Sequence, residues 1–329
     1  RSMKRRDLLC HLPAWLAAAP ALAQAPAGQK LLVMLSPFPL TPNAETVMRQ
    51  ELARLGWREG DNLRLELRHA DNRPERLDTL ERELVALKPA AALAFTSTAA
   101  RALMRQSTNV PMVVAFTFDP VAEGLAASLR RPGGQVTGLS IQHQDIRPKT
   151  YELARQVAPA ARRLAGMFDR RLIPEAQFEA VFAVVRRIAQ QVGLEYVPFP
   201  VRDAGEIEAA LRSLTPARDF VLGLNGDELM YANFATTAAL ARTLRLPSFS
   251  QHQMYARVFG GLFSYGPDMD AMWQRAVGMA AEVLRGQPVG EMPFEQPTRI
   301  GLTLNRTTAD AIGLVLPRDL LLRADEVIG

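Results

Sequence analysis

Short clusters of polar and aromatic residues follow several apolar runs in this sequence, and their side chains are suited to binding a small polar molecule. Aspartate, asparagine, serine and threonine supply charged or hydrogen-bonding groups, while tyrosine and phenylalanine supply flat apolar faces. The candidate ligand-binding residues chosen on this basis are Ser36, Phe38, Thr96, Ser97, Thr98, Asp119, Asn225, Asp227 and Tyr265. They are spread over most of the chain, so a folded scaffold must bring them together.

Three consecutive hydroxyl side chains, Thr96, Ser97 and Thr98, come directly before a helical pattern. Hydroxyls and free backbone N–H groups at the start of a helix suit a carboxylate or another anion. A local role is equally open, because Ser97 or Thr98 could simply cap the helix.

Asp119 stands just past the apolar run 111–116 and is followed by Pro120 and a small-residue pattern that predicts a helix. We expect Asp119 to hold the ammonium group of a zwitterion whose carboxylate lies near Thr98. The alternative is an N-cap, since Asp before Pro at the first helical position is a good capping sequence. On the first interpretation Asp119→Asn weakens binding strongly at near-normal stability; on the second it leaves affinity almost intact.

Other kinds of site find little support in the sequence. No G-x-G-x-x-G follows the first predicted strand, and neither a Walker A sequence nor a G-x-S-x-G elbow occurs. His69, His143 and His252 are isolated, without the spacing of metal ligands. No pair of carboxylates is singled out by an apolar setting. The sequence therefore predicts a protein that is not an enzyme, with no catalytic residues, no metal site and no cofactor.

The scaffold predicted for the candidate residues alternates strands and helices. Predicted strands lie at 30–35, 63–68, 91–95, 111–116, 136–140, 163–168, 195–199, 219–224, 247–250, 260–264 and 299–304. Nearly continuous apolar strands separated by amphipathic helices are typical of parallel sheets covered on both faces. The sequence thus predicts an α/β protein with two doubly wound parallel-sheet lobes. The carboxyl ends of both sheets would face a shared crevice, where ligands of such sheets bind.

Composition limits the class of protein. The chain has 329 residues, of which 48% are hydrophobic and 22% charged, as expected for a globular protein. The formal net charge is +5, but Arg1, Lys4, Arg5 and Arg6 at the N-terminus account for much of it. Basic residues elsewhere form no block, so nucleic-acid binding is not predicted.

The N-terminal segment has the pattern of an export signal. A basic start, an apolar stretch over about 8–22 and small residues near Ala25 predict a cleaved signal peptide over 1–25. Arg5-Arg6 fits a twin-arginine signal, although a simple Sec signal shares most of these features. The single cysteine, Cys10, lies in this segment, so disulfides and thiol chemistry are not predicted for the mature protein. The expected location is the periplasm.

Four segments together carry a resemblance to a known family. They are LxxLGWREGDNLRLELRHAD (52–71), PMVVAFTFDPVAEGLAASLRRPGGQVTGLS (111–140), GGLFSYGPD (260–268) and EQPTRIGLTLNRTTADAIGLVLPRDLLLRADEVI (295–328). The sequence resembles the ABC transporter substrate-binding proteins of the TrpX-like family over essentially the whole predicted mature chain.

The resemblance implies a type I periplasmic-binding-protein fold whose two lobes are joined by a hinge with three crossovers. The expected lobes are 29–140 plus about 267–290, and 141–266 plus about 297–329. Matching positions place the ligand loops at 96–99, Asp119 and 225–227, with Tyr265 beside the last hinge strand. Phe95 and the bulky segment 116–119 depart from the family pattern and could flatten or narrow the pocket.

The expected function is delivery of a small ligand to an ABC permease in the inner membrane. The resemblance favours an amino acid, and an aromatic one in particular, bound by a monomer. Two alternatives stay open: a periplasmic sensor that passes its bound state to a receptor, and a small solute that is not an amino acid.

Overall fold

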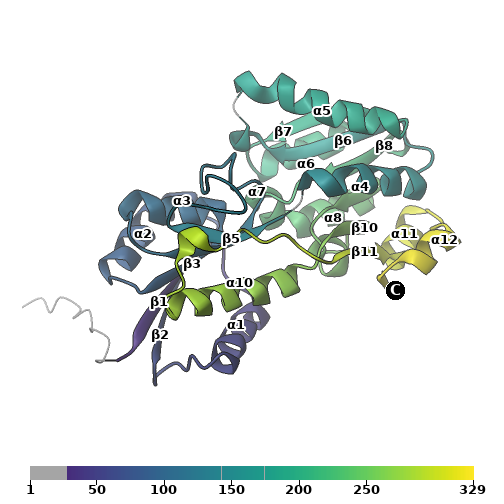
Figure 1. The fold of residues 1–329 in the computed structure, drawn as a ribbon. Coiled ribbons are helices and arrows are strands. Elements are labelled where there is room, and N and C mark those ends of the chain that lie inside the picture. The colour runs from purple at the N-terminus through teal and green to yellow at the C-terminus, as the bar shows by residue number, and fades with distance from the viewer. Residues whose placement is uncertain (1–27, 142, 174) are drawn as a thin grey trace, which may run out of the picture.

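The chain forms two α/β lobes that lie side by side (Figure 1). The computed structural model describes residues 28–141, 143–173 and 175–329. The predicted signal peptide, residues 1–25, lies outside the described residues. Within the described part of the chain, no helix is both long and apolar enough to cross a membrane.

The first lobe is built on a five-stranded parallel sheet in the order β2-β1-β3-β4-β5. Its strands are β1 (Lys30–Ser36), β2 (Leu63–His69), β3 (Ala91–Thr96), β4 (Met112–Thr117) and β5 (Val136–Ser140). Helices α1 (Pro42–Arg54) and α10 (Met269–Leu284) cover one face, and α2 (Leu77–Ala86) and α3 (Ser97–Gln106) cover the other. Because both faces are covered, β1 is buried at every position after Lys30.

The second lobe has a seven-stranded sheet in the order β12-β11-β10-β9-β8-β6-β7. Its strands are β6 (Arg163–Asp169), β7 (Glu195–Val201), β8 (Phe220–Leu224), β9 (Ser248–Ser250), β10 (Phe263–Pro267), β11 (Ile300–Asn305) and β12 (Glu326–Ile328). Strand β7 contains Pro198 and Pro200 and lies at an edge of the sheet, where a missing N–H donor is tolerated.

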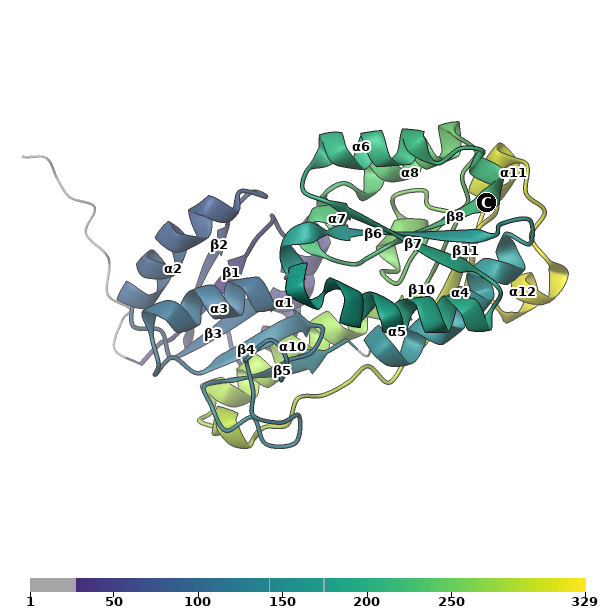
Figure 2. The same ribbon diagram turned by 90° about the horizontal axis from the view of Figure 1, so that it is seen from above.

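Two groups of helices enclose the second sheet, as Figure 2 shows. One face packs against α4 (His143–Val157), α5 (Phe178–Gln191), α11 (Arg306–Ile312) and α12 (Arg318–Arg323). The other face packs against α6 (Ala204–Ser213), α7 (Glu228–Ala232), α8 (Phe234–Thr243) and α9 (Met254–Arg257). Short 3₁₀ turns complete the chain at η1 (Pro74–Arg76), η2 (Arg170–Leu172), η3 (Glu175–Gln177), η4 (Ala217–Asp219) and η5 (Val289–Glu291).

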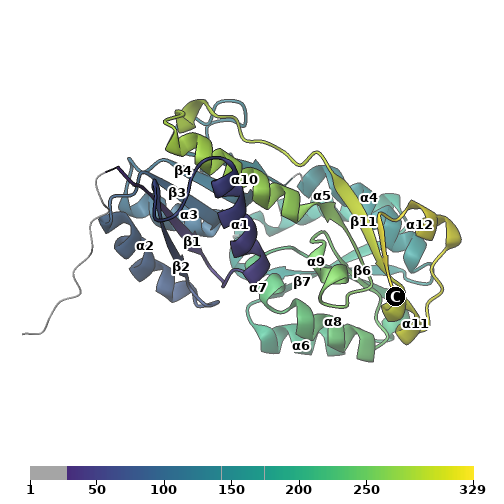
Figure 3. The same ribbon diagram turned by 90° about the horizontal axis from the view of Figure 1, so that it is seen from below.

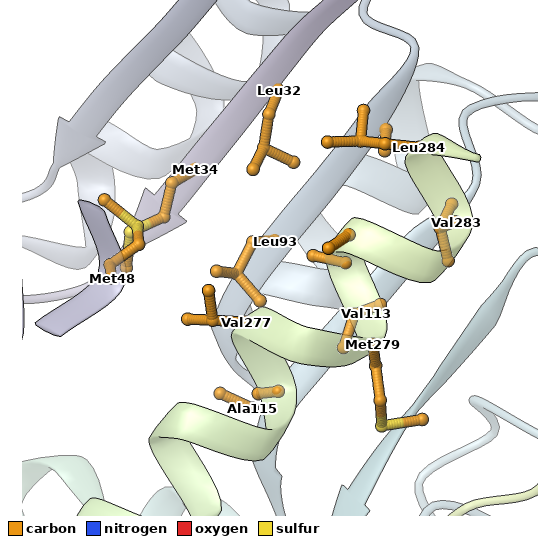
Figure 4. Packing of buried hydrophobic residues seen from close by; sticks show 14 of the residues in the cluster. Leu32, Met34, Met48, Leu93, Val113, Ala115, Val277, Met279, Val283 and Leu284 are labelled. Carbon is orange, nitrogen blue, oxygen red and sulfur yellow. The ribbon is translucent and has the colours of Figure 1, made fainter. Parts of the chain in front are cut away.

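The chain passes between the lobes three times: between β5 and α4, between β10 and α10, and between η5 and β11. Figure 3 shows the last of these segments running from the end of α10 back to β11. Helix α10 returns to the first lobe because its apolar face completes that core. Val277 and Leu284 of α10 belong to the same buried cluster as Leu32, Leu93 and Val113 of the first sheet (Figure 4).

The second sheet differs from the predicted all-parallel one, because β10 and β11 pair antiparallel. That pairing also corrects the predicted strand 260–264, since Pro267 still pairs with Ile300 and the strand spans Phe263–Pro267. Gly266 fits here because a Cβ would lie 1.6 Å from the carbonyl oxygen of Gln251.

Two predicted helices also differ from those observed. The helix expected after Asp119 is absent, and residues 120–124 form turns instead. Gly124 adopts φ +72°, outside the helical range, and the N–H of Leu125 bonds to the carbonyl of Pro120. The helix expected over about 229–244 is divided at Asn233 into α7 and α8.

Candidate ligand-binding cleft

A cavity of about 1120 Å³ separates the two lobes at the carboxyl ends of their parallel strands. The first lobe lines it with the segments that follow β1, β3 and β4 and with the start of α10. The second lobe contributes the segments after β6, β8 and β9 and one face of α5. The volume is ample for a small organic solute.

The fold brings most of the candidate residues to this cavity. Those that line it are Phe38, Thr96, Ser97, Thr98, Asp119, Asn225 and Asp227. Ser36 and Tyr265 are not part of the lining.

Ser36 supports the turn after β1 from beneath. Its hydroxyl is buried and donates a 2.6 Å hydrogen bond to the carbonyl oxygen of Phe38. Tyr265 lies within β10, paired with Leu302, and packs against the core of the second lobe. The expectation that Tyr265 occupies a loop after the strand was wrong, because the strand continues past it.

The cap of α3 is Thr96, which precedes both capping residues considered from the sequence, Ser97 and Thr98. Its Oγ1 accepts a 3.4 Å hydrogen bond from the N–H of Ala99. The hydroxyls of Thr96 and Thr98 act to lower the pKa of Glu228, a cleft-lining carboxyl group of the second lobe. A carboxylate of the protein itself therefore lies near the predicted anion-binding helix start.

Asp119 is exposed at the rim of the cavity and organises its own turn. Its Oδ1 accepts hydrogen bonds from the N–H groups of Val121 and Ala122, at 3.1 and 3.0 Å. The nearby carboxylate of Glu123 folds back onto the same loop. It accepts a 2.8 Å hydrogen bond from the Thr117 hydroxyl and a 3.3 Å bond from the Asp119 N–H.

Asp227 is buried, with 4% of its surface exposed, and caps α7. Its Oδ1 accepts the N–H of Met230 at 2.9 Å, and its Oδ2 accepts the N–H of Asp169 at 3.1 Å and the side-chain amide of Asn225 at 3.3 Å. Burial raises the pKa of Asp227 to about 6, against the opposing effect of these hydrogen bonds. The side chain joins the end of β6 to the segment that follows β8.

Two residues that the sequence patterns did not single out, Glu228 and Tyr231, join the lobes. They lie one turn apart on α7, and both line the cavity. Tyr231 stacks on Phe38 of the first lobe, with ring centroids 5.0 Å apart and an interplanar angle of 29°. The sequence held a signal that could have identified them, because both follow the strand-end segment 225–227 and are spaced to lie on one face of a helix.

Aromatic rings form one wall of the cleft. Phe95 contacts Phe38 edge-on at 5.2 Å, and its ring lies 5.0 Å from Phe116 and 5.3 Å from Trp273. These rings come from the turn after β1, from β3 and β4, and from α10, and all line the cavity. Such a wall suits a flat apolar group of a ligand.

Charged groups in the lining are mostly acidic. The carboxylates are those of Asp119, Glu123, Asp169, Asp227, Glu228 and Asp270, and the guanidinium groups are those of Arg101 and Arg147. Arg101 lies 3.6 Å from Glu123. The excess of carboxylates favours a ligand that carries a positive group.

His252 also lines the cleft, and burial lowers its pKa to about 4, so its ring is neutral at physiological pH. Its Nδ1 accepts a hydrogen bond from the N–H of Met254 at 3.3 Å. Among the residues that the structure describes, no group of three or more His, Cys, Asp or Glu side chains is arranged to hold a metal ion.

Comparison with known proteins identifies a family for this chain. The family described as ABC transporter substrate binding protein matches residues 43–328. The tyrosine-binding protein of Clostridioides difficile (strain R20291) is 24% identical over 259 residues, which are 79% of this chain and 73% of that protein.

Solved structures share the fold at low sequence identity. The ABC domain in complex with L-Trp from Streptococcus pneumonia has a TM-score of 0.80 at 20% identity, covering 91% of this chain and 100% of that one. A conserved domain protein from Vibrio cholerae has a TM-score of 0.79 at 21% identity, covering 91% and 99%. Because the family match extends through both lobes and the cleft between them, this chain belongs to the ABC transporter substrate-binding proteins.

Proposed function

We propose that this protein binds an aromatic amino acid in the cleft outside the cytoplasm and delivers it to an ABC permease. The observation that carries the proposal is the combination of an aromatic wall with an acidic lining in one cavity. A tyrosine or tryptophan side chain would lie against the rings of Phe38, Phe95 and Tyr231. The names of two relatives support this ligand class, since one binds tyrosine and the other was solved with L-Trp.

Most of the candidates that line the cavity are proposed ligand-binding residues: Phe38, Thr96, Ser97, Thr98, Asn225 and Asp227. Asp119 also lines the cavity, but its exposed carboxylate holds its own turn, so it is left out of this set. Ligand binding would hold the lobes together, as in hinge closure around a ligand. Contacts between the lobes, such as the Phe38–Tyr231 stack, are already part of this conformation.

A thermal-shift screen of the twenty amino acids tests the proposal. A ligand that binds only the folded protein adds about 2.7 kcal/mol at a concentration 100 times its Kd. For a chain of this size we expect L-tryptophan or L-tyrosine to raise the melting temperature by about 5 °C. L-Alanine serves as the control, because it lacks a ring for the aromatic wall. A shift by another solute class and by no amino acid would contradict the assignment of the ligand.

A further inference from the structure

Helix α7 carries a carboxylate across the cleft. Asp227 caps the helix, and the next residue, Glu228, reaches the start of α3 in the first lobe. There the hydroxyls of Thr96 and Thr98 act to lower the pKa of its carboxyl group, and all three residues line the cavity. A ligand carboxylate at this helix start would have to displace Glu228 or lie beside a second negative charge.

The surroundings of Glu228 keep its carboxylate partly desolvated but leave it able to accept further hydrogen bonds. Desolvation is the main influence on this group and raises its pKa, while the two threonines and the charge of Arg101 act in the opposite direction. Arg101 also faces Glu123 at 3.6 Å, so its charge is shared between two acids. A carboxylate has about four acceptor positions, and two threonine hydroxyls do not fill them.

Aromatic rings line the same cavity as the Glu228 carboxylate. Tyr231 follows Glu228 by three residues on α7, and its ring stacks on Phe38 at 5.0 Å. Phe95 directly precedes Thr96 and contacts Phe38 edge-on. A carboxylate beside aromatic faces suits an ammonium group, because both attract a cation and a desolvated ion pair is strong.

Asp119 offers a less favourable environment for the same ammonium group. It is exposed, and its Oδ1 is already used by the backbone N–H groups of Val121 and Ala122. Exposed ion pairs contribute little, because water and salt screen them.

We propose that Glu228, rather than Asp119, receives the ammonium group of the ligand. The ligand lies with its amino end between α3 and α7, its ring against Phe38 and Tyr231, and its carboxylate directed away from the start of α3. This assignment rests on the proposed binding of an aromatic amino acid and reverses the orientation predicted from the sequence.

Isothermal titration with two probes tests the orientation. L-Tryptophan carries the ammonium group, and indole-3-propionate has the same ring and carboxylate without it. We expect the wild-type protein to prefer tryptophan by at least about thirtyfold, the minimum typical of a desolvated charge pair. Glu228→Gln keeps the shape and an acceptor oxygen but removes the charge. In this variant the preference should fall to within about threefold, with most of the loss in tryptophan affinity.

Asp119→Asn is the matched control, because it also changes a cleft carboxylate to its amide. We expect it to retain the wild-type preference. Glu228→Asp keeps the charge on a shorter side chain and should retain part of the preference, which provides a second measurement if Glu228→Gln folds poorly.

Three results would overturn the assignment. If Glu228→Gln lost the same factor of affinity for both probes, Glu228 would be a residue that only joins the lobes. If Asp119→Asn lost the preference for tryptophan and Glu228→Gln kept it, Asp119 would be the residue that binds the ammonium group. Failure of the wild-type protein to bind any aromatic amino acid would refute the proposed function itself, and the wild-type titration alone would reveal it.

Discussion

The segments that follow β4 and β8 place the same residue type at the same point of the fold, yet the two aspartates have different surroundings. Asp119 and Asp227 both come after the carboxyl end of a parallel strand, and both line the cleft. Asp119 is exposed and holds a turn, whereas Asp227 is buried and caps a helix. The position of an acid at a strand end therefore does not by itself define its role.

The residues that come next show the same contrast. Glu123 bends back and accepts hydrogen bonds from Thr117 and Asp119 of its own loop. Glu228 instead lies near Thr96 and Thr98 of the other lobe, whose hydroxyls act to lower its pKa. The comparison shows that Glu228, which α7 places near the other lobe, is more available to a ligand than Glu123.

Replacement of each aspartate by alanine should give the largest difference between the two segments. Asp227→Ala leaves three buried or half-buried donors, from Asp169, Asn225 and Met230, without this acceptor. We expect a loss of about 3–5 kcal/mol in the free energy of unfolding. Asp119→Ala should cost about 1 kcal/mol, the usual net value for hydrogen bonds lost at an exposed position. Urea titration measures both, and equal losses would contradict the comparison.

The pH dependence of stability should also depend on Asp227. Its folded-state pKa of about 6 lies above the unfolded value near 3.9, so the folded protein binds this proton more tightly. Stability from this group is therefore fully present below about pH 4 and is lost as pH rises towards 6 and beyond, by about 3 kcal/mol. Unfolding titrations from pH 4 to 7 measure it. Asp227→Asn should remove this pH-dependent loss of stability. An unchanged profile in that variant would show that other groups cause it.

The contact that α7 makes with the first lobe can be tested at Tyr231. Tyr231→Leu removes the ring that stacks on Phe38. We expect about fivefold weaker binding of L-tryptophan, because an aromatic contact contributes about 1 kcal/mol. Tyr231→Phe keeps the ring and is the control, with near-normal affinity expected by calorimetry. Equal weakening in both variants would assign the effect to the hydroxyl instead of the ring.

The smallest effect is expected from Asp119→Asn. Asparagine caps almost as well as aspartate, so the free energy of unfolding should change by less than about 0.5 kcal/mol. Tryptophan affinity should change by less than about threefold, because the charge removed is exposed. This expectation replaces the strong loss predicted from the sequence. A loss of thirtyfold or more at unchanged stability would restore the original interpretation.

Much of the fold could be predicted because the signals are local. Strand β5 occupies the predicted residues 136–140, and most other strands begin or end within about two residues of the prediction. Continuous apolar runs indicated parallel sheets covered on both faces. Both sheets are covered in this way, although the second contains the antiparallel pair of β10 and β11. The errors fall where a distant partner decides the outcome. Tyr265 stays within a strand because β11, more than thirty residues later, pairs with it.

For the candidate site, the sequence by itself determined which segments meet at the cleft, because the carboxyl ends of parallel strands lie at one edge of a sheet. It also determined the residue types available there, including the hydroxyls of Thr96 and Thr98 and the acids of 227 and 228. Only the tertiary structure decided how they are used. Burial turned Asp227 into a cap, and the approach of the second lobe brought Glu228 to α3. Such choices depend on residues that lie 58 or more positions apart in the chain, and no local pattern encodes them.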